Sequence, residues 1–307
     1  MTMNNTLKGY VCGIIAAATY GLNPLFALPL YAHGLNPDSV LFFRYLCAIP
    51  IVGLMAVLRG HSLKIEKRDI IPLALMGIIT ALSSLTLFIS YNYMNAGIAS
   101  TILFVYPVLV ALLMAVIYRE RLSAITLVCM IVALAGIVLL AKAPEGSSVS
   151  LIGVLLAFLS GLTYAIYIVA ANRKQFKKLP TLKMLFYVLL FGTLVFVVRL
   201  MGSTTFTPPT SVMDWGCVIA LAVFPTALSF GGTTMAIHYI GSTPTAILGA
   251  LEPLTAVAVS IAVFGESVTG REWIGMAMII LAVTCVAAAP QVSSLLLRIR
   301  KMFPRKR

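Results

Sequence analysis

The sequence predicts an all-helical membrane protein of ten transmembrane helices, arranged as two inverted repeats of five. Composition is the first reason, because 61% of the 307 residues are hydrophobic and only 10% are charged, far from the balance of a soluble domain. Long apolar runs are the second, and a constant spacing between matching residues in the two halves is the third. The mean hydropathy of +1.04 agrees with hydrocarbon as the main solvent.

Ten apolar runs define the expected spans, since a helix needs about 20 apolar residues to cross the core of a bilayer. Their connections are too short to hold a soluble domain. The runs are continuously apolar instead of alternating, which excludes a transmembrane β-barrel. The spans are expected at Lys8–Leu30, Asp38–Leu58, Ile70–Met94, Gly97–Tyr118, Ser123–Ala141, Leu151–Asn172, Leu182–Met201, Trp215–Tyr239, Ser242–Phe264 and Glu272–Ala289.

Positive charge predicts the orientation of these spans, because cytoplasmic loops retain Lys and Arg. With the N-terminus inside, only Lys142, Arg199 and Arg271 of the 22 basic residues fall outside, and Arg44 lies within the second span. We therefore expect both termini in the cytoplasm, with the protein in the inner membrane if its source is bacterial. Topology then explains the net charge of +13, and no nucleic-acid partner is expected.

The segment after the last span, residues 291–307, alternates apolar residues with cations. Such a basic amphipathic tail suits anionic lipid headgroups on the cytoplasmic face. A tail that only enforces the topology explains the same pattern equally well. Membrane lipids are therefore an expected partner, and the oligomeric state is left open between a monomer and a homodimer.

An internal repeat relates the two halves of the chain. Every matching pair but one is separated by 146 positions, and a small length difference between the halves gives the other pair a separation of 144. Five spans are an odd number, so the second unit must enter the bilayer from the opposite side, as in many transporters. We expect one repeat over 1–147 and the other over 148–290. The pairs are Thr80-Ala81-Leu82-Ser83 with Thr226-Ala227-Leu228-Ser229, Tyr93 with Tyr239, Pro107 with Pro253, Glu120 with Glu266, and, at the shorter separation, Thr19-Tyr20 with Thr163-Tyr164.

Several short motifs now carry a family resemblance over nearly the whole chain: Tyr20-Gly21-Leu22-Asn23, Arg44, Leu251-Glu252-Pro253, and Gly265-Glu266 followed by Gly275. Together with the ten spans and the repeat, they make the chain resemble the EamA-type ten-helix branch of the drug/metabolite transporter superfamily. Tyr20 departs from the Trp that such proteins often carry. The resemblance implies a transporter of small metabolites, with the fifth and tenth helices peripheral and most of the others around a central cavity.

Charged residues inside a bilayer are costly and therefore point to function. Glu252 lies near the middle of the ninth span, where it could take up a proton or bind a substrate ammonium group, or instead form a packing hydrogen bond. Its repeat counterpart is Tyr106. Arg44 lies closer to the outer end of the second span, where it is equally suited to a substrate role and to contact with headgroups. An ion pair between Arg44 and Glu252 is possible from the sequence alone.

Polar and kink-forming residues complete the candidate site. Pro107 and Pro253 each free a backbone carbonyl, which a span tolerates beside neighbours or a wet cavity. We therefore expect the fourth and ninth spans to bend there and to line the cavity. The remaining candidates, for each of which packing alone is an equally good explanation, are Asn23 at a helix discontinuity, the pair Tyr20 and Tyr164 near the site, and Tyr91 with Asn92 at a gate.

No catalytic, cofactor-binding or metal-binding motif is present. The sequence lacks HExxH, GxSxG and Walker A patterns, and its five cysteines are odd in number and far apart. We expect a secondary transporter that exports small amphipathic metabolites by alternating access, and the family resemblance favours amino acids and related solutes. An exchanger of phosphorylated sugars or nucleotide sugars is the alternative within transport, and a channel or an accessory membrane subunit is the alternative from another class.

Overall fold

The computed structural model of this chain describes residues 5–118, 124–141, 150–171, 176, 179–202, 205–240, 245 and 248–285. The basic tail and the loop that carries Glu120 lie outside these residues. Within them the chain is helical and has no strand. The helices are α1 (Asn5–Gly21), α2 (Asn23–Ala32), α3 (Pro37–Leu58), α4 (Lys67–Ser90), α5 (Ala96–Leu103), α6 (Tyr106–Tyr118), α7 (Ala124–Ala141), α8 (Leu151–Ala171), α9 (Thr181–Gly202), α10 (Val212–Ala222), the π-helix η2 (Val223–Leu228), α11 (Ser229–Ile240) and α13 (Leu251–Phe264), with a further helix over 270–285.

Seven of these helices, or consecutive helical segments taken together, are long and apolar enough to cross a membrane. Shorter apolar helices occupy Leu127–Leu139 and Leu251–Phe264. Large aliphatic side chains such as Leu58, Ile71 and Leu281 are exposed on the surface of the bundle. In a protein solvated by lipid this is the expected arrangement, because the bilayer accepts apolar side chains as readily as the core does.

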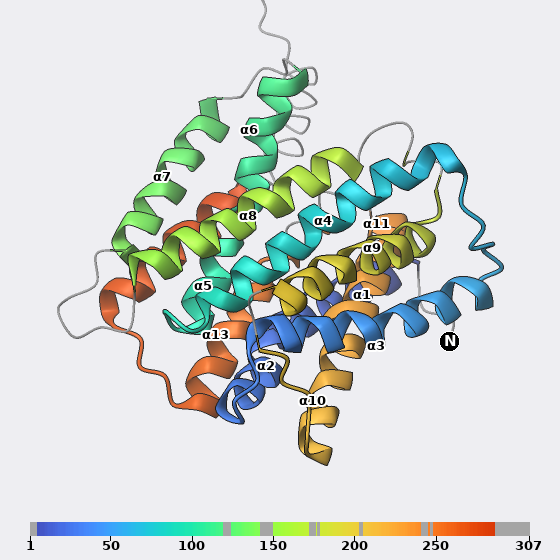
Figure 1. Ribbon diagram of the computed structural model, residues 1–307. Helices are drawn as coiled ribbons and strands as arrows, with labels where there is room; N and C mark the ends of the chain where they lie inside the picture. Colours follow the sequence, from blue (N-terminus) through green and yellow to red (C-terminus); the bar gives the residue numbers. More distant parts are fainter. Residues whose placement is uncertain are drawn as a thin grey trace, which may run out of the picture.

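The helices pack as a bundle in which the two halves are intermingled (Figure 1). A row of contacts joins α8 to α4, α4 to α9 and α9 to α3, so helices of the first half alternate with helices of the second. Helix α1 packs along α11, while α7 lies against α6 and α8. The site is therefore built from both halves of the chain.

Two ends of the bundle can be told apart by which connections lie there. We call N-side the end that holds the start of α1 and the connection from α3 to α4, where the Tyr187 hydroxyl on α9 donates to the carbonyl of Leu63. We call far side the end where the backbone N–H of Ser150, just before α8, donates to the carbonyl of Tyr93 at 3.1 Å. The positive charges predict that the N-side is cytoplasmic.

Close helix contacts depend on glycine at two crossings. A Cβ added to Gly77 on α4 would lie 2.8 Å from the carbonyl oxygen of Val188 and 2.9 Å from the backbone nitrogen of Gly192, both on α9. A Cβ added to Gly21 would lie 2.5 Å from the carbonyl oxygen of Glu252. Because the opposing atoms are backbone, they cannot move aside as a side-chain tip can, and small residues at membrane helix crossings serve this purpose.

Replacing Gly77 by alanine is expected to lower the free energy of unfolding by about 1–3 kcal/mol, the usual cost of forcing an extra carbon into a packed crossing. The measurement is the thermal midpoint of the purified protein in detergent. Gly216→Ala on α10 is the matched control, since a Cβ there meets nothing within 4 Å. Equal midpoints for the two variants would show that α4 and α9 do not approach as described.

Candidate functional site

Two small voids lie in the middle of the bundle, and the ring of Tyr20 borders both. The first void has residues of α3, α4, α8, α9 and α11 around it, and the second lies between α1, α4, α5 and the start of α13. The first is lined by Tyr20, Arg44, Tyr45, Thr80, Ser83, Ser84, Tyr164, Leu185, Leu189, Thr226 and Phe230. The second is lined by Tyr20, Gly21, Asn23, Leu87, Tyr91, Ser100, Leu103 and Glu252.

The voids lie one behind the other along the bundle. Leu185, in the first turns of α9, marks the N-side end of the first void, and Tyr91, which caps α4, marks the far-side end of the second. Each has room for about one water molecule. A metabolite therefore fits only after helices move apart, and Tyr20 is the residue that borders both voids.

Arg44 reaches the first void from α3 and is 5% exposed. Its Nε donates to Thr226 Oγ1 at 3.0 Å, and its Nη1 donates to Asn23 Oδ1 at 3.0 Å. The guanidinium carbon also lies 5.4 Å from the ring centroid of Phe88, a cation–π distance. The side chain therefore points into the bundle and away from headgroups.

The two partners of Arg44 each stabilise a break that a proline causes. Pro24 has no N–H for the carbonyl of Tyr20, and Asn23 Nδ2 donates to that oxygen at 2.8 Å. Pro225 likewise leaves the carbonyl of Leu221 without a helical donor, and Thr226 Oγ1 donates to it at 2.9 Å within the π-helix. Arg44 thus joins a helix break in α1–α2 to another between α10 and α11.

Glu252 lies in the first turn of α13, just after a break at residues 249–250. Its backbone N–H donates to the carbonyl of Gly249 at 2.9 Å, which satisfies the oxygen that Pro253 cannot bond. Its half-buried carboxylate borders the second void and forms no ion pair or side-chain hydrogen bond within the described residues. In particular, Arg44 and Glu252 are not an ion pair in this conformation.

Three tyrosines, Tyr20, Tyr106 and Tyr164, lie at or beside the two voids. The rings of Tyr106 and Tyr164 pack edge to face with centroids 4.8 Å apart. Tyr164 lines the first void together with Tyr20. The side chains of Tyr20, Tyr106 and Tyr164 lie in the neighbourhood of Glu252. Tyr106, the repeat counterpart of Glu252, therefore lies in the same region as the carboxylate.

The other candidates from the sequence fall in different places. Tyr91 lines the second void beside Ser100, whereas Asn92 is exposed at the end of α4 and borders neither void. Pro107 follows a break between α5 and α6, and Pro253 follows the break before α13. Neither proline itself lines a void, although Leu103, four residues before Pro107, and Glu252, directly before Pro253, both do.

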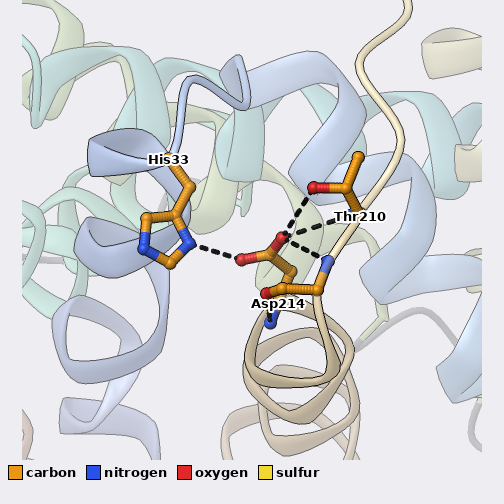
Figure 2. A network of polar contacts seen from close by, with 4 residues as sticks. His33, Thr210 and Asp214 are labelled. Carbon is orange, nitrogen blue, oxygen red and sulfur yellow. Dashed lines mark hydrogen bonds and ion pairs between the residues drawn. The ribbon is translucent and has the colours of Figure 1, made fainter.

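Polar contacts join the two halves of the chain at the far side of the bundle, and Figure 2 shows those around Asp214. His33, after α2, lies 2.6 Å from a carboxylate oxygen of Asp214 at the start of α10. The other oxygen of Asp214 accepts the backbone N–H groups of Ser211 and Thr210 at 3.0 and 3.2 Å. Nearby, Arg199 Nε at the end of α9 lies 2.5 Å from the carboxylate of Asp38 at the start of α3. These bonds tie the two halves together where they are expected to face the outside.

Sequence reasoning missed the hydroxyl groups of the first void. Thr80, Ser83 and Thr226 occur in the repeated motif but are not among the site residues that the sequence predicts, and Ser84 is a further one that it misses. The signal that could have found Thr226 is its position directly after Pro225, since a hydroxyl there can bond the carbonyl that the proline frees. Within the described residues no group of three or more His, Cys, Asp or Glu side chains could hold a metal ion.

The sequence profile of the EamA-like transporter family matches this chain twice, over residues 7–142 and 151–288. The chain belongs to the EamA-like transporter family. It is accordingly an integral membrane protein of the drug/metabolite transporter type. The two matches cover nearly all of the described helices, one for each half, which agrees with the repeat seen in the sequence.

Relatives of this EamA-like chain are themselves described only as transporters. An uncharacterized inner membrane transporter, YicL, of Salmonella typhimurium is 24% identical over 295 residues, which cover 93% of this chain and 97% of that protein. An uncharacterized transporter of Archaeoglobus fulgidus is 29% identical over 243 residues, covering 79% and 82% of the two chains. A solved crystal structure matches with a TM-score of 0.63 at 20% identity over 93% of this chain and 98% of that one, and so shares the fold.

Proposed function

We propose that this EamA-like protein is a secondary transporter that exports small amphipathic metabolites, amino acids or related solutes, by alternating access. The observation that carries the proposal is the pair of voids inside the bundle that Tyr20 borders on both sides. A cation, Arg44, borders one void and a carboxylate, Glu252, borders the other. Solutes that carry both charges and an apolar part match this combination of charged, hydroxyl and aromatic groups.

The proposed topology has ten spans in two inverted repeats, with both termini in the cytoplasm of a cell whose inner membrane holds the protein. Two equivalent helix contacts support an alternating mechanism. Helix α1 packs on α11 towards the N-side, where a Cβ on Gly9 would lie 2.6 Å from Ile240 Cγ2. Helix α8 packs on α4 towards the far side, where a Cβ on Gly153 would lie 3.0 Å from Tyr93 Cβ. Opening one contact while the other stays closed would expose the voids to one side at a time.

Transport by the purified protein in liposomes is the direct test. We expect saturable uptake of a labelled amino acid that is accelerated when the same amino acid is loaded inside, because a carrier returns faster with bound solute than without it. A panel of amino acids, sugar phosphates and nucleotide sugars distinguishes the substrate classes. Flux that rises without saturation would indicate a channel, and saturable exchange of phosphorylated solutes alone would indicate the other transport class.

A further inference from the structure

Among the described residues, no carboxylate forms an ion pair with the buried cation Arg44. The ion pairs among the described residues are His33 with Asp214, Arg68 with Glu66, and Arg199 with Asp38, and none includes Arg44. A charged side chain inside the hydrocarbon region is costly and is usually paired or placed beside a water-filled cavity. Arg44 borders the first void, so the space that faces its charge is the one that a solute would enter.

The guanidinium retains donors for a ligand. It carries five N–H groups, and the hydrogen bonds to Thr226 and Asn23 use one on Nε and one on Nη1. Thr80, Ser83 and Ser84 line the same void, but the hydroxyl groups of Thr80 and Ser83 donate to the carbonyls of Met76 and Ser160. The guanidinium is therefore the main donor group facing the void, and an arginine fork is complementary to a planar anion that offers two oxygens.

The orientation of the guanidinium is held from both sides. Asn23 is 2% exposed and Thr226 is 1% exposed, and both are themselves fixed by bonds to the carbonyls that the neighbouring prolines free. A long side chain that is locked in this way loses little conformational freedom on binding, which favours affinity. An arginine that only contacted lipid headgroups would not need two buried partners that are themselves fixed by hydrogen bonds.

We propose that Arg44 binds the carboxylate group of the transported solute and that Asn23 and Thr226 are positioning residues for it. A carboxylate carries one charge and matches one guanidinium, whereas a phosphate monoester carries nearly two charges at neutral pH and needs more cations than this void offers. The inference rests on the proposed transport function and adds the chemical group that is recognised and the residue that recognises it.

Paired ligands test this assignment. Purified full-length protein in detergent is titrated with each common L-amino acid and with the corresponding amide, and binding is measured from the shift in Tm. For each acid that stabilises the wild type, the amide is expected to bind about 10- to 100-fold more weakly, as for the loss of hydrogen bonds to a charged group. In Arg44→Gln the acid and its amide are expected to bind equally.

The ratio of acid to amide affinity does not depend on the fraction of protein that is folded. Further variants test whether a change in this ratio comes from Arg44 and its two partners. Arg44→Lys keeps the charge without the fork and is expected to give an intermediate ratio. Thr226→Val is expected to lower the ratio, while Thr226→Ser, which keeps the hydroxyl, restores it. Arg59→Gln, an exposed arginine at the N-side end of α3, leaves it unchanged.

Three results would overturn the assignment. One is equal binding of acids and amides to the wild type, and another is an acid preference that survives in Arg44→Gln; either would leave the transporter proposal standing if liposome exchange is still observed. The third is the absence of binding and exchange for every amino acid, which would remove the proposed function and this inference together.

Discussion

Glu252→Gln is expected to abolish the pH dependence of transport while the protein still folds. The amide has nearly the shape of the carboxyl group but cannot take up or release a proton, so it removes a coupling step without changing the packing. The carboxylate has no ion pair or side-chain hydrogen bond within the described part of the chain, so little stability depends on it. The measurement is the initial rate of uptake into liposomes over a range of external pH.

The matched control is Glu66→Gln, which removes a glutamate whose side chain is 66% exposed and is paired with the exposed Arg68. It is expected to retain the pH dependence of the wild type. A wild-type pH profile in the Glu252→Gln protein would rule out proton coupling through this residue. Loss of all uptake in a folded variant, tested with counterflow at one pH, would instead indicate that the carboxylate contacts the solute.

Ser160→Ala is expected to favour opening towards the far side. Ser160 Oγ on α8 donates to the carbonyl of Ser83 on α4 at 2.7 Å, and Ser83 Oγ donates to the carbonyl of Ser160 at 3.0 Å. At the equivalent contact between α1 and α11, the repeat offset places Ser229 opposite Ala16, which has no hydroxyl. Only one of the two contacts therefore has this reciprocal pair of bonds.

The expected size follows from the usual worth of hydrogen bonds between membrane helices. One such hydrogen bond contributes about 0.6 kcal/mol on average and up to about 1.7 kcal/mol. Losing that free energy changes the ratio of the two open states by about 3- to 20-fold. Ala16→Ser adds a hydroxyl at the other contact and is expected to shift the ratio in the same direction, by closing the N-side. Alkylation by a water-soluble maleimide reports each opening, with single cysteines at Leu185→Cys for the first void and Leu103→Cys for the second in a cysteine-free background.

Thr163→Ala is the control for the Ser160→Ala and Ala16→Ser variants. The Thr163 hydroxyl on α8 donates to the carbonyls of Leu159 and Ser160 in its own helix and so does not join two helices. If Ser160→Ala and Thr163→Ala gave the same alkylation rates as the parent protein, the serine pair would have no part in setting the open state. A higher rate at Leu185→Cys in the Ser160→Ala protein would contradict the expected direction.

Much of the architecture follows from the sequence. Long apolar runs predict helices, and the resemblance to EamA-type transporters is confirmed by the matches over both halves. The structure divides several expected spans, since the run Lys8–Leu30 forms α1 and α2 with a break at Leu22. Asn23-Pro24 marks that break in the sequence. Seven spans meet the length and hydropathy criteria among the described residues, and the count of ten stays a prediction.

The site is less accessible to sequence reasoning, because its bonds join residues far apart in the chain. Asn23 was predicted to bind substrate at a helix discontinuity, but its amide already bonds Tyr20 and Arg44. Arg44 was equally compatible with headgroup contact, and only the fold shows its side chain turned inward. The bonds from Arg44 to Thr226 and from Ser83 to Ser160 span 182 and 77 positions, and no local pattern specifies either.

The single arginine and the single glutamate have a stereochemical consequence. An ancestral pair of identical halves would place equivalent groups on both sides of the pseudo-twofold axis, and a solute could then bind in two opposite directions. Here the repeat counterpart of Glu252 is Tyr106, and the position 146 residues after Arg44 is Leu190. A solute that carries one carboxylate would therefore bind in one direction relative to the axis instead of two equivalent ones, and it would keep that direction whichever side of the membrane it enters from.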